Sequence, residues 1–521
     1  MTTATPPPAH FNFAADVLER NAGRAGRVAY LDDRARLTYG ELAERARRFA
    51  AGLAALGLRR EERVLLLAHD TIEWPVAFLG ALYAGVVPVA VNTLLTADDY
   101  AYMLAHSRAR AAIVSGALLP TLRQAMARGT HEVGDVVVIR PGTDAHGTRP
   151  FDSLLTAAPA AAPAATHADD AAFWLYSSGS TGKPKGAVHT HGNLYWTDAL
   201  YGRQVLCLRE DDVVYSAAKL FFAYGLGNAL TFPLYAGATT VLLPDRPTPA
   251  AVFQQLVAQR ATVFFGVPTL YAAMLASPEL PPRERLALRL AVSAGEALPR
   301  DIGDRFTAHF GCEVLDGLGS TEMLHIFLSN RAGAVRYGTT GVPVPGYDIQ
   351  LRGEDGRTVA DGDIGDLFVR GPSAALMYWC DRERSRATFQ GDWVKSGDKY
   401  VRNADGDYVY SGRGDDMLKV SGQYVSPFEV EAALMRHAAV LEAAVVGRID
   451  ADGLTRTKAF VVLKPGHAGN GPLEDELKTF VKDKLAPFKY PRYLEFVSEL
   501  PKTATGKIQR FRLRERENAA R

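Results

Sequence analysis

Cysteine is scarce in this chain of 521 residues, and that scarcity excludes an architecture held together by disulfides. The three cysteines, Cys207, Cys312 and Cys380, are odd in number, lie far apart and have no metal-ligand spacing. Such usage fits a reducing compartment, so we expect a cytoplasmic protein. The start, MTTATPPPAHFNF, lacks both the basic beginning and the apolar core of a secretion signal.

An excess of charge of either sign is also missing, because 59 basic side chains nearly cancel 58 acidic ones. The chain therefore lacks the bulk field that draws proteins onto nucleic acid or an anionic membrane. One uncharged run, residues 74–92, approaches the length of a membrane span. Pro75, Gly80, Gly85 and Pro88 interrupt it, and valines fill its second half. The run is better explained as a buried helix, a turn and a buried strand.

The composition is that of a globular protein, with 47% hydrophobic and 22% charged residues, and the length is too great for one core. Helix and strand patterns alternate through the first half, which is typical of α/β folds. Beyond Gly338, short strands with Gly and Asp turns predict a β-rich subdomain, and a smaller α/β region follows. We therefore predict two domains, residues 1–414 and 415–521, with the Ala/Pro-rich stretch 156–166 as a surface connection.

The stretch YSSGSTGKPKG, residues 176–186, combines glycines, hydroxyls and two lysines directly after a predicted strand. That combination indicates a loop that binds phosphate through backbone amides, hydroxyls and charge. It is not a Walker A loop: Ser177 occupies the position of the first glycine, and Pro184, which follows Lys183, has no N–H to donate. The loop therefore serves a different phosphate chemistry.

The segment SSGSTGKPKGAVHTHGN resembles the phosphate loop of the acyl-adenylate-forming (ANL) superfamily: acyl-CoA synthetases, firefly luciferase and peptide-synthetase adenylation domains. Further motifs follow in that family's order: DGLGSTE (316–322), SGDKY (396–400), GRGDDMLKVSG (412–422) and PKTATGKIQR (501–510). The resemblance implies a large N-terminal domain of α/β and β-rich subdomains and a small, mobile C-terminal α+β domain. It also implies the chemistry, in which a carboxylate attacks the α-phosphorus of ATP, pyrophosphate leaves, and a thiol displaces AMP.

The resemblance assigns a role to each matching residue. Lys507 bridges the attacking carboxylate and the α-phosphate, Glu322 is the metal-linked glutamate for Mg²⁺, and Lys419 serves the thioester-forming face. Asp415 is the hinge between the domains, and Gly422 admits the thiol of coenzyme A. The residues expected to bind ATP and AMP are Ser177, Ser178, Gly179, Ser180, Thr181, Gly182, Lys183, Lys185, Gly295, Glu296, Ala297, Asp316, Gly317, Leu318, Thr321, Asp398 and Arg413.

The acid pocket is expected around AKLFFAYGLGN, residues 218–228, unless FFAYG is plain core. Several members of the family have a histidine at the position of Phe222, so the role of that histidine is not transferred to this chain. A small residue beside Tyr224 leaves room for a flat ring, and His325 closes the pocket. Together with STEMLHIF and VSAGEALP, the pattern most resembles the benzoate–CoA ligases. The residues expected to line the pocket are Lys219, Phe222, Ala223, Tyr224, Gly225, Gly319, His325 and Ile326.

We therefore expect a ligase that joins benzoate or a close analogue to coenzyme A, using ATP and Mg²⁺. The alternatives are 4-hydroxybenzoate, a cinnamate-type or a medium-chain acid, luciferase-type oxygenation, and an inactive adenylation fold that only binds. The intact Lys507, Glu322, Asp398 and Arg413 argue against the last. Because the chain ends soon after Lys507, we expect free coenzyme A rather than a carrier domain. The expected partners are small molecules, neither nucleic acid nor membrane, and a lysine acetyltransferase acting on Lys507; the protein is expected to be a monomer or homodimer.

Overall fold

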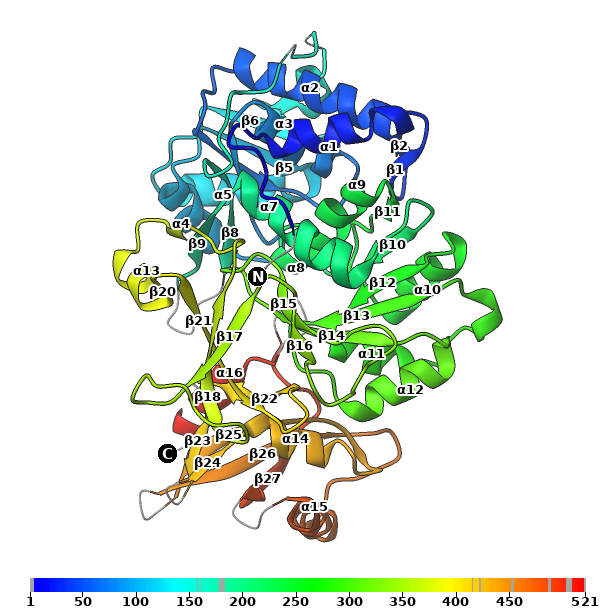
Figure 1. Ribbon diagram of the computed structural model, residues 1–521, viewed down its shortest axis with the longest axis vertical. Helices are drawn as coiled ribbons and strands as arrows, with labels where there is room; N and C mark the ends of the chain where they lie inside the picture. The colour runs from blue at the N-terminus through cyan, green and yellow to red at the C-terminus, as the bar shows by residue number, and fades with distance from the viewer. Residues whose placement is uncertain are drawn as a thin grey trace.

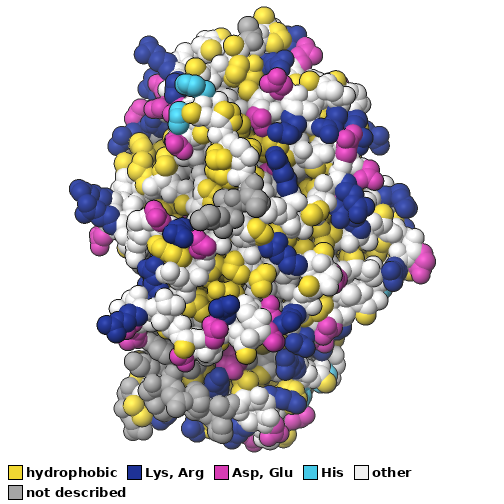
Figure 2. Space-filling model, viewed as in Figure 1, with side chains coloured by type: hydrophobic (Ala, Val, Ile, Leu, Met, Phe, Trp, Pro, Cys, Tyr) yellow, Lys and Arg dark blue, Asp and Glu magenta, His cyan; other side chains and the backbone are white. Residues whose placement is uncertain are grey.

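The computed structural model describes residues 4–156, 158–160, 162–177, 183–414, 416–420, 423–450, 454–485, 489–502 and 508–519. The chain runs from the N-terminal sheets at one end of the long axis to a separate C-terminal domain at the other (Figure 1). Charged side chains of both signs are interspersed over the face in Figure 2, as the balanced net charge predicts. No described helix has the length and apolarity needed to cross a lipid bilayer.

The first sheet of the described chain has eight strands in the order β19-β9-β8-β4-β3-β5-β6-β7. Strands β3 to β8 pair in parallel, whereas β9 pairs antiparallel with both β8 and β19. The strands are β3 (Arg63–Leu67), β4 (Val87–Ala90), β5 (Ala111–Ser115), β6 (Asp135–Ile139), β7 (Arg149–Pro150), β8 (Ala171–Ser177), β9 (Lys185–Thr190) and β19 (Met377–Tyr378).

The second sheet has nine strands in the order β16-β15-β14-β13-β12-β10-β11-β1-β2, and its central pairs are parallel. Both sheets confirm the α/β fold that the alternating pattern predicted. The strands are β1 (Val28–Leu31), β2 (Arg36–Thr38), β10 (Val213–Ser216), β11 (Thr239–Val241), β12 (Val263–Gly266), β13 (Leu290–Ala294), β14 (Val314–Gly319), β15 (Ile326–Ser329) and β16 (Val342–Pro343).

Helices cover both faces of the first sheet. Along β3, Val64 and Leu66 belong to one hydrophobic core, and Leu65 and Leu67 belong to another on the opposite face. The helices before the C-terminal domain are α1 (Phe13–Arg20), α2 (Tyr39–Ala55), α3 (Glu73–Tyr83), α4 (Ala97–Ser107), α5 (Leu119–Arg128), α6 (Phe151–Leu154), α7 (His191–Thr197), α8 (Ala223–Leu226), α9 (Phe232–Ala236), α10 (Pro249–Ala258), α11 (Pro268–Leu275), α12 (Arg300–Phe310) and α13 (Arg382–Thr388).

The uncharged run 74–92 folds as predicted. It forms helix α3, a turn at Gly85 with φ of +71°, and strand β4, and nearly all of it is buried. Helix α2 shows the same agreement between local sequence and structure. Thr38 and Glu41 form a capping box at its start, and Gly57 follows its end with φ of +84°.

The β-rich region beyond Gly338 is also confirmed. Antiparallel strands pair in the order β17-β18-β21-β20, and β22 pairs with β21. This sheet lies between the α/β sheets and the C-terminal domain in Figure 1. Its strands are β17 (Asp348–Arg352), β18 (Ile364–Arg370), β20 (Phe389–Gln390), β21 (Trp393–Arg402) and β22 (Tyr408–Arg413).

The small C-terminal domain has hydrophobic cores of its own, built around a three-stranded sheet. The predicted boundary falls at Asp415, which lies outside the described residues, so the boundary stays a prediction. The elements are β23 (Leu418–Val420), β24 (Gln423–Val425), α14 (Pro427–Leu434), β25 (Val440–Ile449), β26 (Thr455–Leu463), α15 (Gly471–Lys484), β27 (Tyr493–Phe496) and α16 (Arg510–Ala519).

Candidate active site

The predicted phosphate loop joins β8, which ends at Ser177, to β9, which begins at Lys185. Its centre, Ser178, Gly179, Ser180, Thr181 and Gly182, lies outside the described residues. The exposed Lys183 ammonium lies 5.2 Å from the centre of the Tyr102 ring. Lys183 and Lys185 thus lie just before β9 and at its first residue.

Two segments predicted to enclose adenine follow neighbouring parallel strands. Ala294, the last residue of β13, is in register with Gly317 in β14. Gly295–Ala297 therefore emerges beside Asp316–Leu318, and Gly295 takes the left-handed φ of +93°. Burial raises the pKa of Asp316 well above its usual value, which favours the neutral carboxyl. The sheet thus places both segments at one edge, where α/β folds bind ligands.

Glu322 stands in the turn after β14, and segments distant in sequence hold that turn. Buried His189 bonds the carbonyl of Thr321 through Nε2 at 2.8 Å. The Tyr378 hydroxyl donates to Glu322 Oε1 at 2.6 Å, and Lys185 Nζ lies 4.0 Å from the same oxygen. The structure therefore brings together Lys185 and Glu322, two predicted site residues 137 positions apart by their numbers. Tyr378 lies outside all of the motifs that resemble the family.

Asp398 and Arg413, predicted to bind ribose, are register partners on β21 and β22. Their charged groups lie 3.6 Å apart, with the aspartate mostly buried and the arginine half-exposed. The antiparallel pairing alone brings the two motifs SGDKY and GRGDD side by side.

The C-terminal domain meets this site next to the predicted catalytic lysine. The backbone N–H of Ile508 donates to the Glu296 carboxylate at 3.3 Å. Lys507 itself lies outside the described residues, as do Asp415 and Gly422. Lys419 lies in β23, and the described part of the chain does not include its side chain.

The predicted acid pocket is built around His325. Its Nε2 lies 3.2 Å from the Tyr224 carbonyl and 3.1 Å from Asn228 Oδ1. Both partners are acceptors, so Nε2 carries the proton, and burial lowers the pKa of His325 to about 3. The imidazole is therefore neutral. The rings of Tyr224, Tyr201 and Phe232 lie 5.7, 5.3 and 4.6 Å from it.

Glycine is required at three positions near this imidazole, because an added Cβ would overlap the His325 ring at one of them and a backbone carbonyl at the other two. A Cβ on Gly227 would lie 2.3 Å from His325 Cδ2, and one on Gly319 would lie 2.6 Å from its carbonyl oxygen. A Cβ on Gly225 would lie 2.0 Å from the Lys219 carbonyl oxygen. Gly227 begins one of two π-helical segments here, η3 (Asp198–Leu206) and η4 (Gly227–Thr231), and such segments are frequent at functional sites.

The remaining predicted pocket residues occupy one chain segment and one strand. Ala223 is buried at the start of α8, Phe222 packs on Phe221 with ring centres 4.4 Å apart, and Ile326 begins β15. The Tyr224 hydroxyl donates to the Val292 carbonyl at 3.0 Å, which ties the segment to β13.

Lys219 has protein partners that the sequence did not indicate. Its ammonium donates to the carbonyls of Leu243 and, at 2.7 Å, Asp245. Asp70 lies buried beside it, and burial raises the pKa of that carboxyl to about 6. The Leu220 N–H donates to both Asp70 oxygens at 3.3 Å. These backbone carbonyls thus accept hydrogen bonds from the ammonium that was predicted to hold the acid. A role of Lys219 toward the acid stays a prediction.

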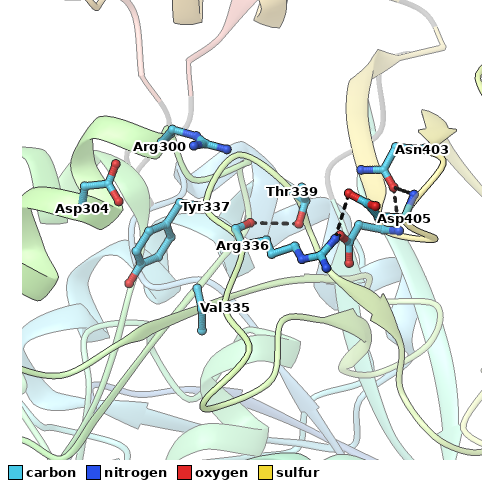
Figure 3. A pocket seen from close by; sticks show the side chains of 9 residues that line it. Arg300, Asp304, Val335, Arg336, Tyr337, Thr339, Asn403 and Asp405 are labelled. Carbon is cyan, nitrogen blue, oxygen red and sulfur yellow. Dashed lines mark hydrogen bonds and ion pairs between the residues drawn. The ribbon is translucent and has the colours of Figure 1, made fainter.

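A separate polar cavity of about 370 Å³ contains none of the predicted site residues (Figure 3). Arg336, one of its lining residues, forms ion pairs with Asp407 and Asp405 at 2.8 and 3.1 Å. The other side chains that line it are Arg300, Asp304, Val335, Tyr337, Thr339 and Asn403.

Comparison with known proteins covers nearly the whole chain. Residues 17–379 match the AMP-binding enzymes, and residues 429–507 match the C-terminal domain of AMP-binding enzymes. The chain is 55% identical over 524 residues to a benzoate–CoA ligase of Thauera aromatica, with 98% of each chain covered. It is 49% identical to a 4-hydroxybenzoate–CoA/benzoate–CoA ligase of Rhodopseudomonas palustris, covering 97% of this chain and 94% of the relative.

Solved structures give the same result. A benzoate CoA ligase from Burkholderia xenovorans superposes with a TM-score of 0.92 and 62% identity, over 97% of this chain and 100% of that one. An anthranilate CoA ligase in complex with anthranoyl-AMP superposes with a TM-score of 0.94 and 41% identity, over 99% of this chain and 98% of that one.

Proposed function

We propose that this chain, which belongs to the family of AMP-binding enzymes, joins benzoate or a close analogue to coenzyme A with formation of AMP. The observation that carries the proposal is the contact between Ile508 and Glu296, which joins the C-terminal domain to the nucleotide segment at the residue after Lys507 by number. The full-length similarity to benzoate–CoA ligases supports benzoate as the acid. The three free cysteines agree with a cytoplasmic enzyme, which is part of the proposal.

In the first half-reaction, charged side chains of the protein hold the substrates and stabilise the charges that develop on them. Asp398 accepts hydrogen bonds from the ribose hydroxyls, and Lys183 and Lys185 receive the departing pyrophosphate. Lys507 stabilises the charge that develops between the carboxylate and the α-phosphate. Glu322 is a suitable ligand for Mg²⁺, which takes one or two protein carboxylates beside phosphate oxygens and offsets phosphate charge when bound.

Selection of the acid follows from the His325 surroundings. Aromatic rings and a neutral imidazole offer a flat ring the offset and edge contacts that aromatics prefer. The relative from Rhodopseudomonas palustris acts on 4-hydroxybenzoate as well as benzoate, so 4-hydroxybenzoate is the second candidate. The described pocket gives no observation that favours a medium-chain acid over these.

We expect a panel of acids to be ranked by ring shape. Pyrophosphate release with ATP should be fastest with benzoate, weaker with monosubstituted benzoates, and lowest with octanoate, because the pocket is lined by rings. The measurement is the initial rate for each acid at matched concentrations, with product thioesters identified by mass spectrometry. Turnover of octanoate without turnover of benzoate would contradict the proposal that the substrate is an aryl acid.

Replacing Gly227 with Ala is expected to raise the KM for benzoate about tenfold, because the new Cβ displaces the His325 imidazole at a cost of about 1–3 kcal/mol. The KM for ATP should stay unchanged. Steady-state kinetics with each substrate varied gives both values. The matched control is Gly26→Ala, where an added Cβ meets nothing within 4 Å. A normal benzoate KM in Gly227→Ala would show that His325 does not shape the pocket.

A further inference from the structure

Tyr378 stands between two opposite charges of the site. Its hydroxyl donates to Glu322 Oε1 at 2.6 Å and accepts a hydrogen bond from Lys185 Nζ at 3.1 Å. The Lys185 ammonium also lies 4.4 Å from the centre of the Tyr378 ring. Tyr378 is 2% exposed, and burial together with the Glu322 charge raises its pKa, so the hydroxyl keeps the proton that it donates.

The backbone around Tyr378 is fixed independently of this contact. Tyr378 pairs with Ala187 in β9, the strand that Lys185 begins. The Tyr378 N–H donates to Ser385 Oγ at 3.0 Å, and the ring packs on Phe389 with centres 5.4 Å apart. The hydroxyl is therefore presented by a rigid support, as a positioning group needs to be.

The same segment holds the main chain of the Glu322 turn. The Ala375 N–H donates to the Glu322 carbonyl at 2.7 Å, and Ser373 Oγ donates to the Met323 carbonyl at 2.8 Å. Both the backbone and one carboxylate oxygen of Glu322 thus depend on residues 373–378. Within the described part of the chain, no hydrogen bond reaches the other oxygen, Oε2.

We propose that Tyr378 is a positioning residue that holds Glu322 for Mg·ATP and keeps the Lys185 ammonium from hydrogen-bonding to it directly. At 4.0 Å, Lys185 Nζ and Glu322 Oε1 form a loose ion pair, and a small side-chain movement would close it into a hydrogen-bonded one. A hydrogen-bonded pair would engage both the carboxylate that the metal needs and the ammonium that the phosphates need. The inference rests on the proposed function, because that function supplies the metal and the nucleotide.

The test is Tyr378→Phe, which removes one oxygen and keeps the ring. Binding of the non-reactive analogue α,β-methylene-ATP is measured by calorimetry over a series of Mg²⁺ concentrations. The Mg²⁺ concentration for half-maximal binding should rise about 10- to 100-fold, the usual effect of losing a group that orients a metal ligand. Thioester formation from supplied benzoyl-AMP should stay at the wild-type rate. An unchanged Mg²⁺ requirement would overturn the proposal.

Three further variants separate positioning from general stability. Tyr39→Phe removes another buried hydroxyl, which donates to the Ala238 carbonyl at 2.7 Å, and it should lower the melting temperature without altering the Mg²⁺ requirement. Adding Lys185→Met to Tyr378→Phe should lower the Mg²⁺ requirement relative to Tyr378→Phe alone, because no ammonium then competes for Glu322. The affinity for α,β-methylene-ATP at saturating Mg²⁺ should fall in the same variant, because a phosphate-binding lysine is lost. Ser385→Ala, which loosens the Tyr378 backbone and keeps its hydroxyl, should raise the requirement less, and this variant decides the question if Tyr378→Phe does not fold.

The acid plays no part in this binding measurement, so the two proposals can fail separately. Wild-type protein that does not bind α,β-methylene-ATP with Mg²⁺ would contradict the proposed function. Normal binding by wild type, with an unchanged Mg²⁺ requirement in Tyr378→Phe, would contradict only the role of Tyr378.

Discussion

Replacing Lys507 with Ala is expected to slow benzoyl-AMP formation about 100- to 1000-fold, because the transition state loses a charge aimed at the reacting oxygens. The N–H of Ile508, the residue after Lys507 by number, donates to the Glu296 carboxylate, so Ile508 lies at the nucleotide segment. Thioester formation from supplied benzoyl-AMP should be largely retained, because that step starts after the adenylate exists. Pyrophosphate release measures the first step, and benzoyl-CoA formation measures the second.

A nearby lysine of the same sequence motif, PKTATGKIQR, provides the control for this variant. Lys502 lies five residues before Lys507 by number and forms an ion pair with Glu442 at 2.5 Å, inside the C-terminal domain. Lys502→Ala should leave both half-reactions near their wild-type rates, because its partner is not substrate. Adenylation at the wild-type rate in Lys507→Ala would show that another group stabilises the transition state. Equal loss of both half-reactions would point to a folding defect.

The sequence predicted the fold well where local pattern decides structure. The charge-free run 74–92 has turn residues at the points where helix α3 ends and strand β4 begins. The capping box at Thr38 similarly marks the start of α2. These signals lie within a few residues of the structure they specify, so they can be read without knowledge of the fold.

The candidate site could be predicted only where a motif carried it. Glu322 and Asp398 were named because each belongs to a short motif, although nothing in their own neighbourhoods distinguishes them from surface carboxylates. Tyr378 escaped notice because its partner Glu322 is 56 residues away by number, and the two meet only in the folded chain, where the Ala375 N–H also bonds the Glu322 carbonyl. Asp70 escaped for the same reason, since its partner Leu220 is 150 residues distant. Contacts of this kind follow from tertiary packing, which a single sequence does not display.

The second large effect is expected in the C-terminal domain, from Glu431→Ala. The Glu431 carboxylate is 3% exposed and accepts hydrogen bonds from Arg510 at 3.0 and 2.6 Å and from the Val445 N–H at 2.7 Å. Its negative charge raises the pKa of Arg510 against the effect of burial. Removing the carboxylate leaves that mostly buried guanidinium without its partner, so the free energy of unfolding should fall by about 3 kcal/mol.

Urea denaturation followed by circular dichroism measures this loss, with the C-terminal transition treated separately because a chain with two domains need not unfold in one step. The control is Glu442→Ala, which breaks the partly exposed pair with Lys502 and should cost at most about 1 kcal/mol. Combining Glu431→Leu with Arg510→Met should recover most of the stability, since neither charge then remains unpaired. A loss in Glu431→Ala no larger than the control's would show that the Arg510 charge finds another partner.

The pair of Arg510 and Glu431 couples stability to catalysis because of where Arg510 lies in the chain. Arg510 begins α16, three residues after Lys507 by number, and it fixes that helix to α14 through Glu431. Arg514, one turn further along α16, pairs with Asp416, next to the predicted hinge. In protein that remains folded, Glu431→Ala should therefore slow adenylation more than thioester formation, because the anchor of α16, which begins three residues after Lys507 by number, is lost while the adenylate site is intact. Equal slowing of the two steps would show that the pair of Arg510 and Glu431 does not determine the placement of Lys507.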